Sequence, residues 1–406
     1  MSSLHAQELQ HLYTQAMADY RKKDYPSFYT HIKEANKLNP FHQGIMYQAG
    51  IASALTDKKE EAIKFLQQAI LIDANFKLEG IADFKSIKDT DEFKELIALQ
   101  KEWQRSIVHS TVAFTLKDRS IHPEPIAFDA SSGSFYLGSI HQRKIIKRTA
   151  DGVVSDFCKA GTEGMGSVMA LKIDAQKNIL WAGTSPLQEM ENYDSLAQSI
   201  IFKFDLHSGK LLQKFIAPKK GVYGDLILDP KGRVYLSDSE TNELTLINEK
   251  TGHIEPFYSS TEFLSLQGIT FSDDARQLFI ADYVKGIFRL DVSTKKLTEV
   301  TTTQSVSLHG IDGLYFYHHS LIAIQNGVVP ARATRYFLDK EKNTITGFEI
   351  IDRHHPDFGE PTLGVMAGNT FYYIANSQWG GYDTRHHLKP TDQLKDVIIL
   401  KAELKP

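Results

Sequence analysis

Residues Gly224–Gly252 read GDLILDPKGRVYLSDSETNELTLINEKTG, and this stretch decides the fold. Apolar residues alternate along three short segments of it, with the period of two that half-buried strands require. The segments are bounded by Asp-Pro-Lys-Gly and Lys-Thr-Gly turns, whose residues tolerate tight or left-handed backbone. The stretch therefore predicts one small antiparallel sheet, which has to stack on similar sheets to bury both of its faces.

The same pattern recurs in looser form as far as the C-terminus. The repeats are spaced by roughly 43 to 57 residues and open at His122, Gly166, Tyr223, Leu266, His309 and Gly359. Six such repeats predict a six-bladed β-propeller with one four-stranded sheet per blade. The last repeat shows only three clear strands, and the segment Ser110–Leu116 is a strand left over before the first repeat. We expect this strand to complete the last blade and so remove an exposed sheet edge.

The N-terminal part of the chain follows a helical period instead. Small residues return after thirty-four positions, for example Ala16 and Gly50, a spacing that resembles the tetratricopeptide repeat. We therefore expect a mainly β protein with a helical, tetratricopeptide-like domain over residues 1–106 and a six-bladed propeller over residues 107–406. The helical domain is either a module that binds a peptide or protein partner or a structural appendage.

Composition excludes several classes of function. The net charge of −4 and the pI near 6.5 argue against a protein that binds nucleic acid or a membrane surface. Cys158 is the only cysteine, so an intramolecular disulfide and a multi-cysteine metal site are both excluded. The sequence has no apolar run as long as a membrane span and no secretory signal, which predicts a soluble protein, cytoplasmic as written or periplasmic if a leader was trimmed.

The first strand of each propeller blade lines the central channel, so polar residues at the starts of these strands converge on the axis. They are Glu124, Ser167, Asp225, Gln267, Asp312 and Glu360. Four carboxylates around one axis repel each other and raise one another's pKa unless a cation lies among them. Carboxylate and amide oxygens suit a hard divalent ion, Ca²⁺ above all, better than zinc. The predicted ligands are Glu124, Asp225, Gln267, Asp312 and Glu360.

Several propeller segments also match a known pattern. They are a Glu-Pro pair before the first inner strand, Asp-Leu-x-x-Asp-Pro-x-Gly, Gln-Gly-Ile-x-Phe-Ser-Asp-Asp and Gly-Ile-Asp-Gly-Leu. Over residues 110–404 the chain thus resembles the senescence marker protein/gluconolactonase family, with its paraoxonase and strictosidine synthase relatives. The resemblance implies a propeller that holds one divalent metal in its channel and hydrolyses lactones or related esters. Carried over, Glu124 matches the family's metal-binding Glu and Asp312 its Asp, whereas Gly224 and Gln267 stand where the family has Asn.

Two functions remain open. The first is a metal-dependent hydrolase in which the ion polarises a lactone carbonyl and either Asp312 or His309 acts as general base. In this hypothesis the channel mouth binds substrate through His122, Gln325, Asn326 and Trp379. The second is a non-catalytic propeller that binds a ligand or protein, with the helical repeats as an interaction module. A phosphate-binding loop and a nucleophile elbow are both missing from the sequence, which disfavours nucleotide chemistry and serine hydrolysis.

Overall fold

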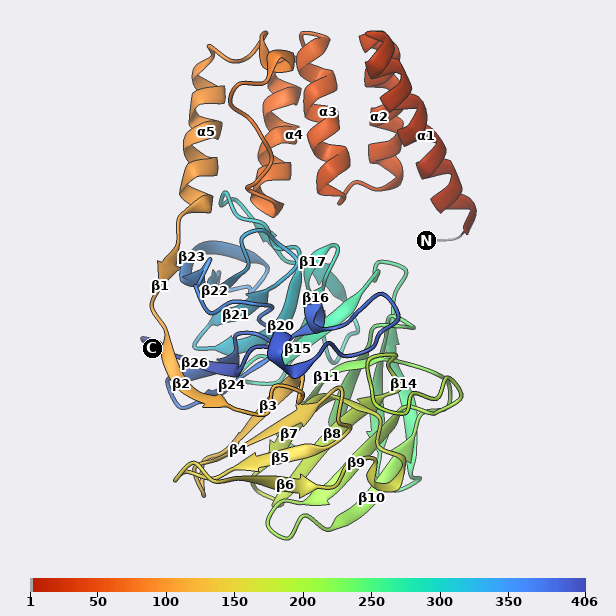
Figure 1. The fold of residues 1–406 in the computed structure, drawn as a ribbon, viewed down its shortest axis with the longest axis vertical. Helices are drawn as coiled ribbons and strands as arrows, with labels where there is room; N and C mark the ends of the chain where they lie inside the picture. Colours follow the sequence, from red (N-terminus) through yellow and green to blue (C-terminus); the bar gives the residue numbers. More distant parts are fainter. Residues whose placement is uncertain (1–2) are drawn as a thin grey trace. The chain divides into compact units, whose positions relative to one another are not determined.

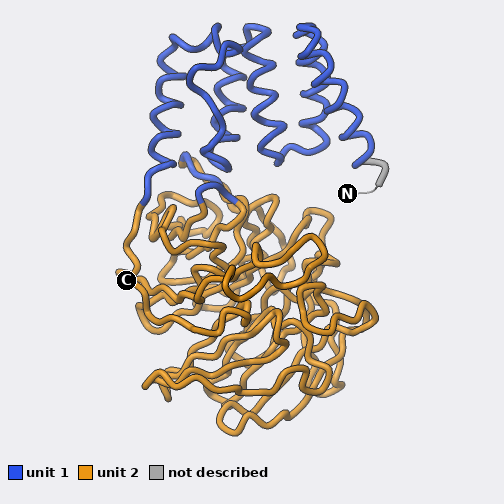
Figure 2. Tube along the Cα trace, in the orientation of Figure 1, with its two compact units in different colours: residues 1–106, 305–307, 328–330 blue, residues 107–304, 308–327, 331–406 orange. Residues whose placement is uncertain are grey.

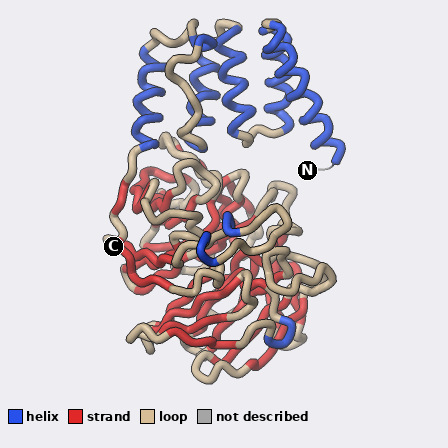
Figure 3. Tube along the Cα trace, in the orientation of Figure 1, coloured by secondary structure: helices blue, strands red, loops and turns tan. Residues whose placement is uncertain are grey.

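The computed structural model describes residues 3–406, and the chain divides into two compact units (Figure 2). One unit contains the residues up to Ser106 together with the short segments 305–307 and 328–330. The other contains residues 107–304, 308–327 and 331–406. Figure 3 shows that the long helices belong to the first unit and the strands to the second. The predicted fold class is therefore confirmed: a six-bladed β-propeller preceded in the chain by a helical region.

The helical unit is built from neighbouring antiparallel helices that share one apolar core. Its helices are α1 (Ser3–Lys22), α2 (Tyr25–Leu38), α3 (Gln43–Leu55), α4 (Lys59–Ile72), the 3₁₀ turn η1 (Ala82–Phe84) and α5 (Asp91–Gln104). The Thr90 hydroxyl accepts a hydrogen bond from the Phe93 N–H and caps α5. A Cβ on Gly50 would lie 2.7 Å from the Leu66 side chain, so only glycine allows α3 and α4 to pack this closely. The likeness to tetratricopeptide repeats stays a prediction.

No helix of the described chain combines the length and the apolar character needed to cross a bilayer.

The propeller consists of six sheets, one per predicted repeat, and their strands pair antiparallel except for the short β19, which pairs parallel with β23 (Figure 1). The first blade contains β3 (Pro123–Asp129), β4 (Ser134–Ser139), β5 (Ile145–Arg148) and β6 (Val154–Cys158), and the second contains β7 (Ser167–Asp174), β8 (Ile179–Ser185), β9 (Ile200–Asp205) and β10 (Leu211–Ile216). The third blade contains β11 (Tyr223–Leu228), β12 (Val234–Asp238), β13 (Glu243–Asn248) and β14 (His253–Ser259). The fourth contains β15 (Leu266–Phe271), β16 (Gln277–Asp282), β17 (Gly286–Asp291) and β18 (Leu297–Glu299).

The fifth and sixth blades complete the ring. The fifth contains β20 (Ile311–Tyr317), β21 (Ser320–Gln325), β22 (Arg332–Leu338) and β23 (Thr344–Arg353), with the short strands β1 (Ile107–Val108) and β19 (Thr301–Thr302) paired to β23. The sixth contains β24 (Gly364–Ala367), β25 (Thr370–Ile374), β26 (Val397–Glu403) and β2 (Thr111–Leu116). Three 3₁₀ turns lie between strands: η2 (Thr162–Gly164), η3 (Trp379–Gly381) and η4 (Thr391–Gln393).

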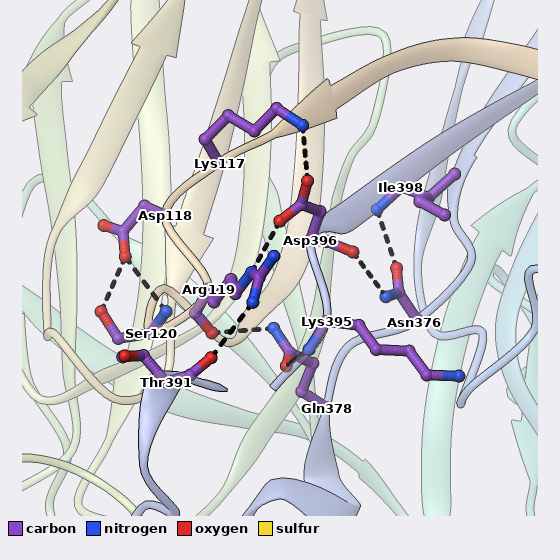
Figure 4. Close-up of polar contacts among 10 residues, drawn as sticks. All are labelled: Lys117, Asp118, Arg119, Ser120, Asn376, Gln378, Thr391, Lys395, Asp396 and Ile398. Carbon is purple, nitrogen blue, oxygen red and sulfur yellow. Dashed lines mark hydrogen bonds and ion pairs between the residues drawn. The ribbon is translucent and has the colours of Figure 1, made fainter. Parts of the chain in front are cut away.

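The ring is closed by β2, as the sequence predicts. This strand pairs antiparallel with β26, from Thr111 opposite Lys401 to Leu116 opposite Val397. Just beyond the pairing, the Asp396 carboxylate accepts hydrogen bonds from Lys117 Nζ at 2.6 Å and Arg119 Nε at 2.7 Å (Figure 4). Strands β2 and β26 are therefore joined by a backbone ladder, and the residues just outside the ladder by charge-assisted hydrogen bonds.

The entry of the chain into the propeller is held by Asp352. One oxygen of this fully buried carboxylate accepts the backbone N–H groups of His109 and Ser110 at 2.9 and 3.2 Å. Its other oxygen accepts the hydroxyl of Tyr373 in β25. Asp352 thus ties the segment before β2 to blades five and six.

We predict that Asp352→Ala lowers the free energy of unfolding by about 2–4 kcal/mol, because it removes the acceptor of the buried Ser110 N–H, of the part-buried His109 N–H and of the shorter hydrogen bond of the Tyr373 hydroxyl. Tyr373→Phe removes only one donor and should cost about 1 kcal/mol. Urea unfolding of both variants checks the difference. A loss in Asp352→Ala no larger than that in Tyr373→Phe contradicts the assignment.

Candidate functional site

The inner strands of all six blades form a closed ring around the central channel. In this ring β3 contacts β7, followed by β11, β15, β20 and β24, and β24 contacts β3 again. Four of these strands carry the predicted residues near their starts: Glu124 in β3, Asp225 in β11, Gln267 in β15 and Asp312 in β20. Glu360 lies just before β24. The architecture therefore places these predicted side chains on adjoining strands.

Register shifts lie beside the site in five of the six inner strands. They fall between Pro123 and Ile126 in β3, Val168 and Ala170 in β7, Tyr223 and Asp225 in β11, Leu266 and Ile269 in β15, and Ile311 and Leu314 in β20. A β-bulge re-aims the side chains next to it and interrupts the simple alternation of faces. The orientation of each carboxylate consequently depends on its own bulge.

Glu124 and Asp312 each have one oxygen held by a neighbouring side chain. Trp379 Nε1 donates to Glu124 Oε2 at 3.0 Å, and Asn326 Nδ2 donates to Asp312 Oδ2 at 2.8 Å. The Tyr283 hydroxyl donates to Asn326 Oδ1 at 2.9 Å and so fixes the amide that holds Asp312. Within the described chain, Glu124 Oε1 and Asp312 Oδ1 accept no hydrogen bond from the protein.

Burial and the charges of neighbouring carboxylates make both carboxyl groups hard to ionise. Burial raises the pKa of Glu124 well above its usual range, the nearby charge of Asp312 adds to the effect, and the Trp379 N–H opposes it. Burial also raises the pKa of Asp312 to about 7; the Asn326 amide opposes this shift, and the charges of Glu360 and Asp225 add to it. In the free protein, Asp312 therefore changes its charge close to neutral pH.

Asp225 is engaged differently from the predicted ligand role. Its Oδ1 accepts the Leu226 N–H at 2.8 Å and its Oδ2 accepts the Ile269 N–H at 3.1 Å, which ties β11 to β15. Burial raises the pKa of Asp225, and the Lys172 ammonium, 3.9 Å from Oδ1, opposes that shift. Because protein donors already occupy both of its oxygens, Asp225 is less available to a cation than Glu124 or Asp312.

Gln267 and Glu360 lie at the edge of the site. Gln267 Nε2 makes one long hydrogen bond, 3.5 Å, to Ser265 Oγ. Glu360 lines a hollow of about 230 Å³ together with Asn376, Gln378 and Leu394. Burial raises the pKa of Glu360, and its charge is felt at both Glu124 and Asp312. That Gln267 and Glu360 bind a cation stays a prediction.

Gln325 belongs to the packed interior of blade five, and His309 lies half-buried just before that blade's first strand. Gln325 is fully buried; its Nε2 donates to the His309 carbonyl at 2.7 Å, and its Oε1 accepts from Arg332 Nε at 2.9 Å and from the Tyr336 hydroxyl at 2.6 Å. These protein contacts occupy the amide that was predicted to bind substrate. Burial lowers the pKa of His309 to about 4, so its imidazole is neutral at pH 7.

His122 and Trp379 belong to one aromatic cluster, and nothing in the sequence indicates that these two side chains are in contact. The two rings meet edge to face with centroids 4.6 Å apart, and His122 Nδ1 lies 2.7 Å from the Tyr382 hydroxyl. Burial, with a smaller contribution from His141, lowers the pKa of His122 to about 3. Sequence reasoning missed Tyr283 and Tyr382, which hold the predicted residues in place. The only signal for Tyr382 was its position in the same aromatic, glycine-rich segment as Trp379.

The donor chemistry of the channel fits a hard cation only in part. Glu124 and Asp312 each have one carboxylate oxygen that accepts no hydrogen bond from the described part of the protein, and Glu360 lies nearby. Carboxylate oxygens are the ligands that Ca²⁺ prefers. However, no three His, Cys, Asp or Glu side chains of residues 3–406 converge into a ready-made metal cluster. A cation would therefore be held by Glu124 together with one or more of the other predicted ligands Gln267, Asp312 and Glu360.

Comparison with solved structures shows the fold alone. The propeller is similar to an aldose sugar dehydrogenase from Streptomyces coelicolor in its PQQ-bound form, with 12% identity, a TM-score of 0.50, and coverage of 74% of this chain and 98% of that one. It is equally similar to a gluconolactonase from Xanthomonas campestris, with 11% identity, a TM-score of 0.50, and coverage of 74% and 97%. No family model and no curated protein matches the sequence. The scaffold is shared, and the residues of the site determine the chemistry.

We predict that Gly268→Ala displaces Asp312. An added Cβ would lie 2.5 Å from the Leu314 nitrogen and 2.6 Å from the Asp312 carbonyl oxygen, so β15 and β20 would have to separate. Overpacking of this kind costs about 1–3 kcal/mol of unfolding free energy. Gly347→Ala in β23 is the matched control, because its Cβ would meet Phe337 at an ordinary 3.7 Å. Equal stability of the two variants in denaturant contradicts the close approach.

We also predict that Asp312 makes the metal-free protein less stable as the pH rises. The folded pKa of about 7 lies above the ordinary value of about 4. Between these values the folded state keeps a proton that the unfolded state has lost, so the stabilising contribution present below pH 4 disappears by about pH 7. Asp312→Asn removes this dependence. Unfolding from pH 4 to 8 should show the variant gaining on the wild type as the pH rises, and a pH-independent difference contradicts the assignment.

Proposed function

We propose that the propeller is a hydrolase of a lactone or related ester, with its active site in the central channel and a divalent cation, Ca²⁺ first, as cofactor. The observation that supports this most is the pair of channel carboxyl groups Glu124 and Asp312, each with one oxygen fixed by a neighbouring side chain. A small molecule is the expected substrate, since the fold is shared with a gluconolactonase. The shared fold by itself does not determine the substrate.

Asp312 is the proposed general base. Its pKa of about 7 is close to the value at which a base is both available and strong enough at neutral pH. The chain Tyr283, Asn326 and Asp312 fixes one carboxylate oxygen, which leaves Oδ1 to take the proton of an attacking water. As the water oxygen adds to the acyl carbon and the ring C–O bond breaks, that proton returns to the leaving oxygen, and the product is a hydroxy acid.

Glu124 faces the same space from β3. Its Oε1 would hold the cation beside Asp312, and Trp379 keeps Oε2 engaged. A bound divalent ion would supply Lewis-acid polarisation of the scissile carbonyl. The protein itself supplies the enclosed, weakly polarisable surroundings in which such a charge acts strongly.

We predict that Asp312→Asn lowers kcat/KM for a hydrolysed lactone at least about 100-fold, which is the usual contribution of a general base. Asp392→Asn, an exposed carboxylate in η4, is the matched control and should keep wild-type turnover. A pH-stat assay over a panel of lactones and aryl esters, with Ca²⁺ and after chelation, checks this. No turnover of any panel member by the wild type, or equal rates in Asp312→Asn, would sink the proposal.

The engagement of Asp225 favours a second candidate, a non-catalytic propeller that binds a ligand. With both Asp225 oxygens occupied and Gly224 beside it, fewer oxygens remain for a metal than in a fully acidic channel. In that case the helical unit would be the module for a peptide or protein partner. A Glu124→Ala/Asp312→Ala double variant that still captures its partner while binding no metal would favour this candidate over the hydrolase.

A further inference from the structure

The loop between β25 and β26 brings Trp379 and Tyr382 to residues of the first blade. Trp379 Nε1 reaches Glu124 Oε2 at 3.0 Å, and the Tyr382 hydroxyl lies 2.7 Å from His122 Nδ1. The His122 ring in turn meets the Trp379 ring at 90°. Two side chains from near the C-terminus, Trp379 and Tyr382, therefore contact Glu124 and His122 in the first part of the propeller sequence.

The base of this loop is anchored on both sides of Trp379. Gln378 has a φ of +78°, a conformation that side-chain-bearing residues rarely adopt. Its Nε2 donates to the Arg119 carbonyl at 2.9 Å, and its Oε1 accepts the Lys395 N–H at 3.3 Å (Figure 4). The next residue, Asp396, is held by Lys117 and Arg119. The backbone at Trp379 is thus fixed by the same contacts that close the ring.

Like Gln378, His122 has a positive φ, and it lies close to Glu124 in the sequence. Its φ is +41°, and its side chain is almost fully buried. Uncommon backbone conformations persist only where the surrounding structure imposes them, and they gather at functional sites. Here two of them, at His122 and Gln378, flank the contact between Trp379 and Glu124.

The indole N–H limits what Glu124 can offer to a ligand. A free carboxylate can rotate and bind an ion through either or both of its oxygens. With Oε2 held by Trp379, only Oε1 remains without a protein donor in the described chain. Trp379 was predicted from the sequence to contact substrate, and the structure gives its N–H a protein partner instead.

We propose that Trp379 is a positioning residue: its indole N–H fixes Glu124 Oε2, so that Glu124 presents Oε1 alone to the channel. The anchored loop between β25 and β26 sets this geometry. The inference rests on the proposed function in that it takes Glu124 as part of the site. It extends that function by placing the orientation of a channel carboxylate under the control of a loop outside the ring of inner strands.

Ca²⁺ alone, added to the full chain, is the first probe. In the wild type, Ca²⁺ should change the tryptophan emission through Trp379, whereas Trp103 and Trp181 lie in apolar cores and supply a constant background. Trp379→Phe keeps a ring but removes the donor. It should abolish the emission change and weaken Ca²⁺ binding about tenfold by calorimetry, as loss of a group that orients a metal ligand typically does.

Tyr382→Phe is the matched control, because it releases His122 but leaves the Trp379 N–H in place. It should retain the emission change and bind Ca²⁺ within about threefold of the wild type, well short of a full loss of the orienting group. Circular dichroism confirms that each variant is folded. Wild-type Ca²⁺ affinity in Trp379→Phe overturns the inference.

Isotope-edited infrared spectroscopy separates this inference from the proposed function, because it needs neither metal nor turnover. The carboxyl band that Glu124→Gln removes belongs to Glu124, and this band should shift in metal-free Trp379→Phe but not in Tyr382→Phe. If the wild type binds no Ca²⁺, the metal half of the proposed function fails, and a shifted band still supports the positioning role. An unshifted band overturns the positioning role whatever the metal result.

Discussion

The antiparallel pairing of β2 with β26 is the interaction on which the rest of the propeller depends. Without it, the sixth blade would expose an edge, and the first blade would have an incomplete neighbour. The apolar cluster between these blades includes Phe114 and Leu116 from β2, Ile126 from β3 and Ile399 from β26. Joining the two ends of the propeller sequence therefore buries apolar surface as well as closing a ladder. The entropic cost of closing so long a segment grows only slowly with its length.

Closing the ring creates an electrostatic problem at its centre. The inner strands all begin near one axis, so the carboxyl groups at their starts are forced together in surroundings that solvate charge poorly. Nearby groups stabilise these carboxylates. The Trp379 indole donates a hydrogen bond to Glu124, the Asn326 amide donates to Asp312, and backbone N–H groups and the Lys172 ammonium lie beside Asp225. These donors offset part of the cost and leave the pKa values of Glu124 and Asp312 raised. Groups in this condition are suited to proton transfer or to binding a cation.

The fold alone does not select between these uses. The same scaffold occurs in a PQQ-bound sugar dehydrogenase and in a gluconolactonase, each only about one-eighth or less identical to this chain. The proposed hydrolase activity depends instead on two particular carboxyl groups and on the loop that orients one of them. Asp225 has a channel position and an acidic side chain, but backbone N–H groups already occupy both of its oxygens.

The sequence by itself determined the number of blades, the closing strand and the convergence of Glu124 and Asp312. These features follow from alternation, turn residues and repeat spacing, which are local properties of the chain. Only the tertiary structure decided which oxygens are free. The bulges beside Asp225 and Asp312 break the alternation from which a side-chain direction would be inferred, and register shifts leave no fixed mark in the sequence. Trp379 and Tyr382 lie in a loop without a period, and their contacts with Glu124 and His122 exist because ring closure brings the last blade against the first.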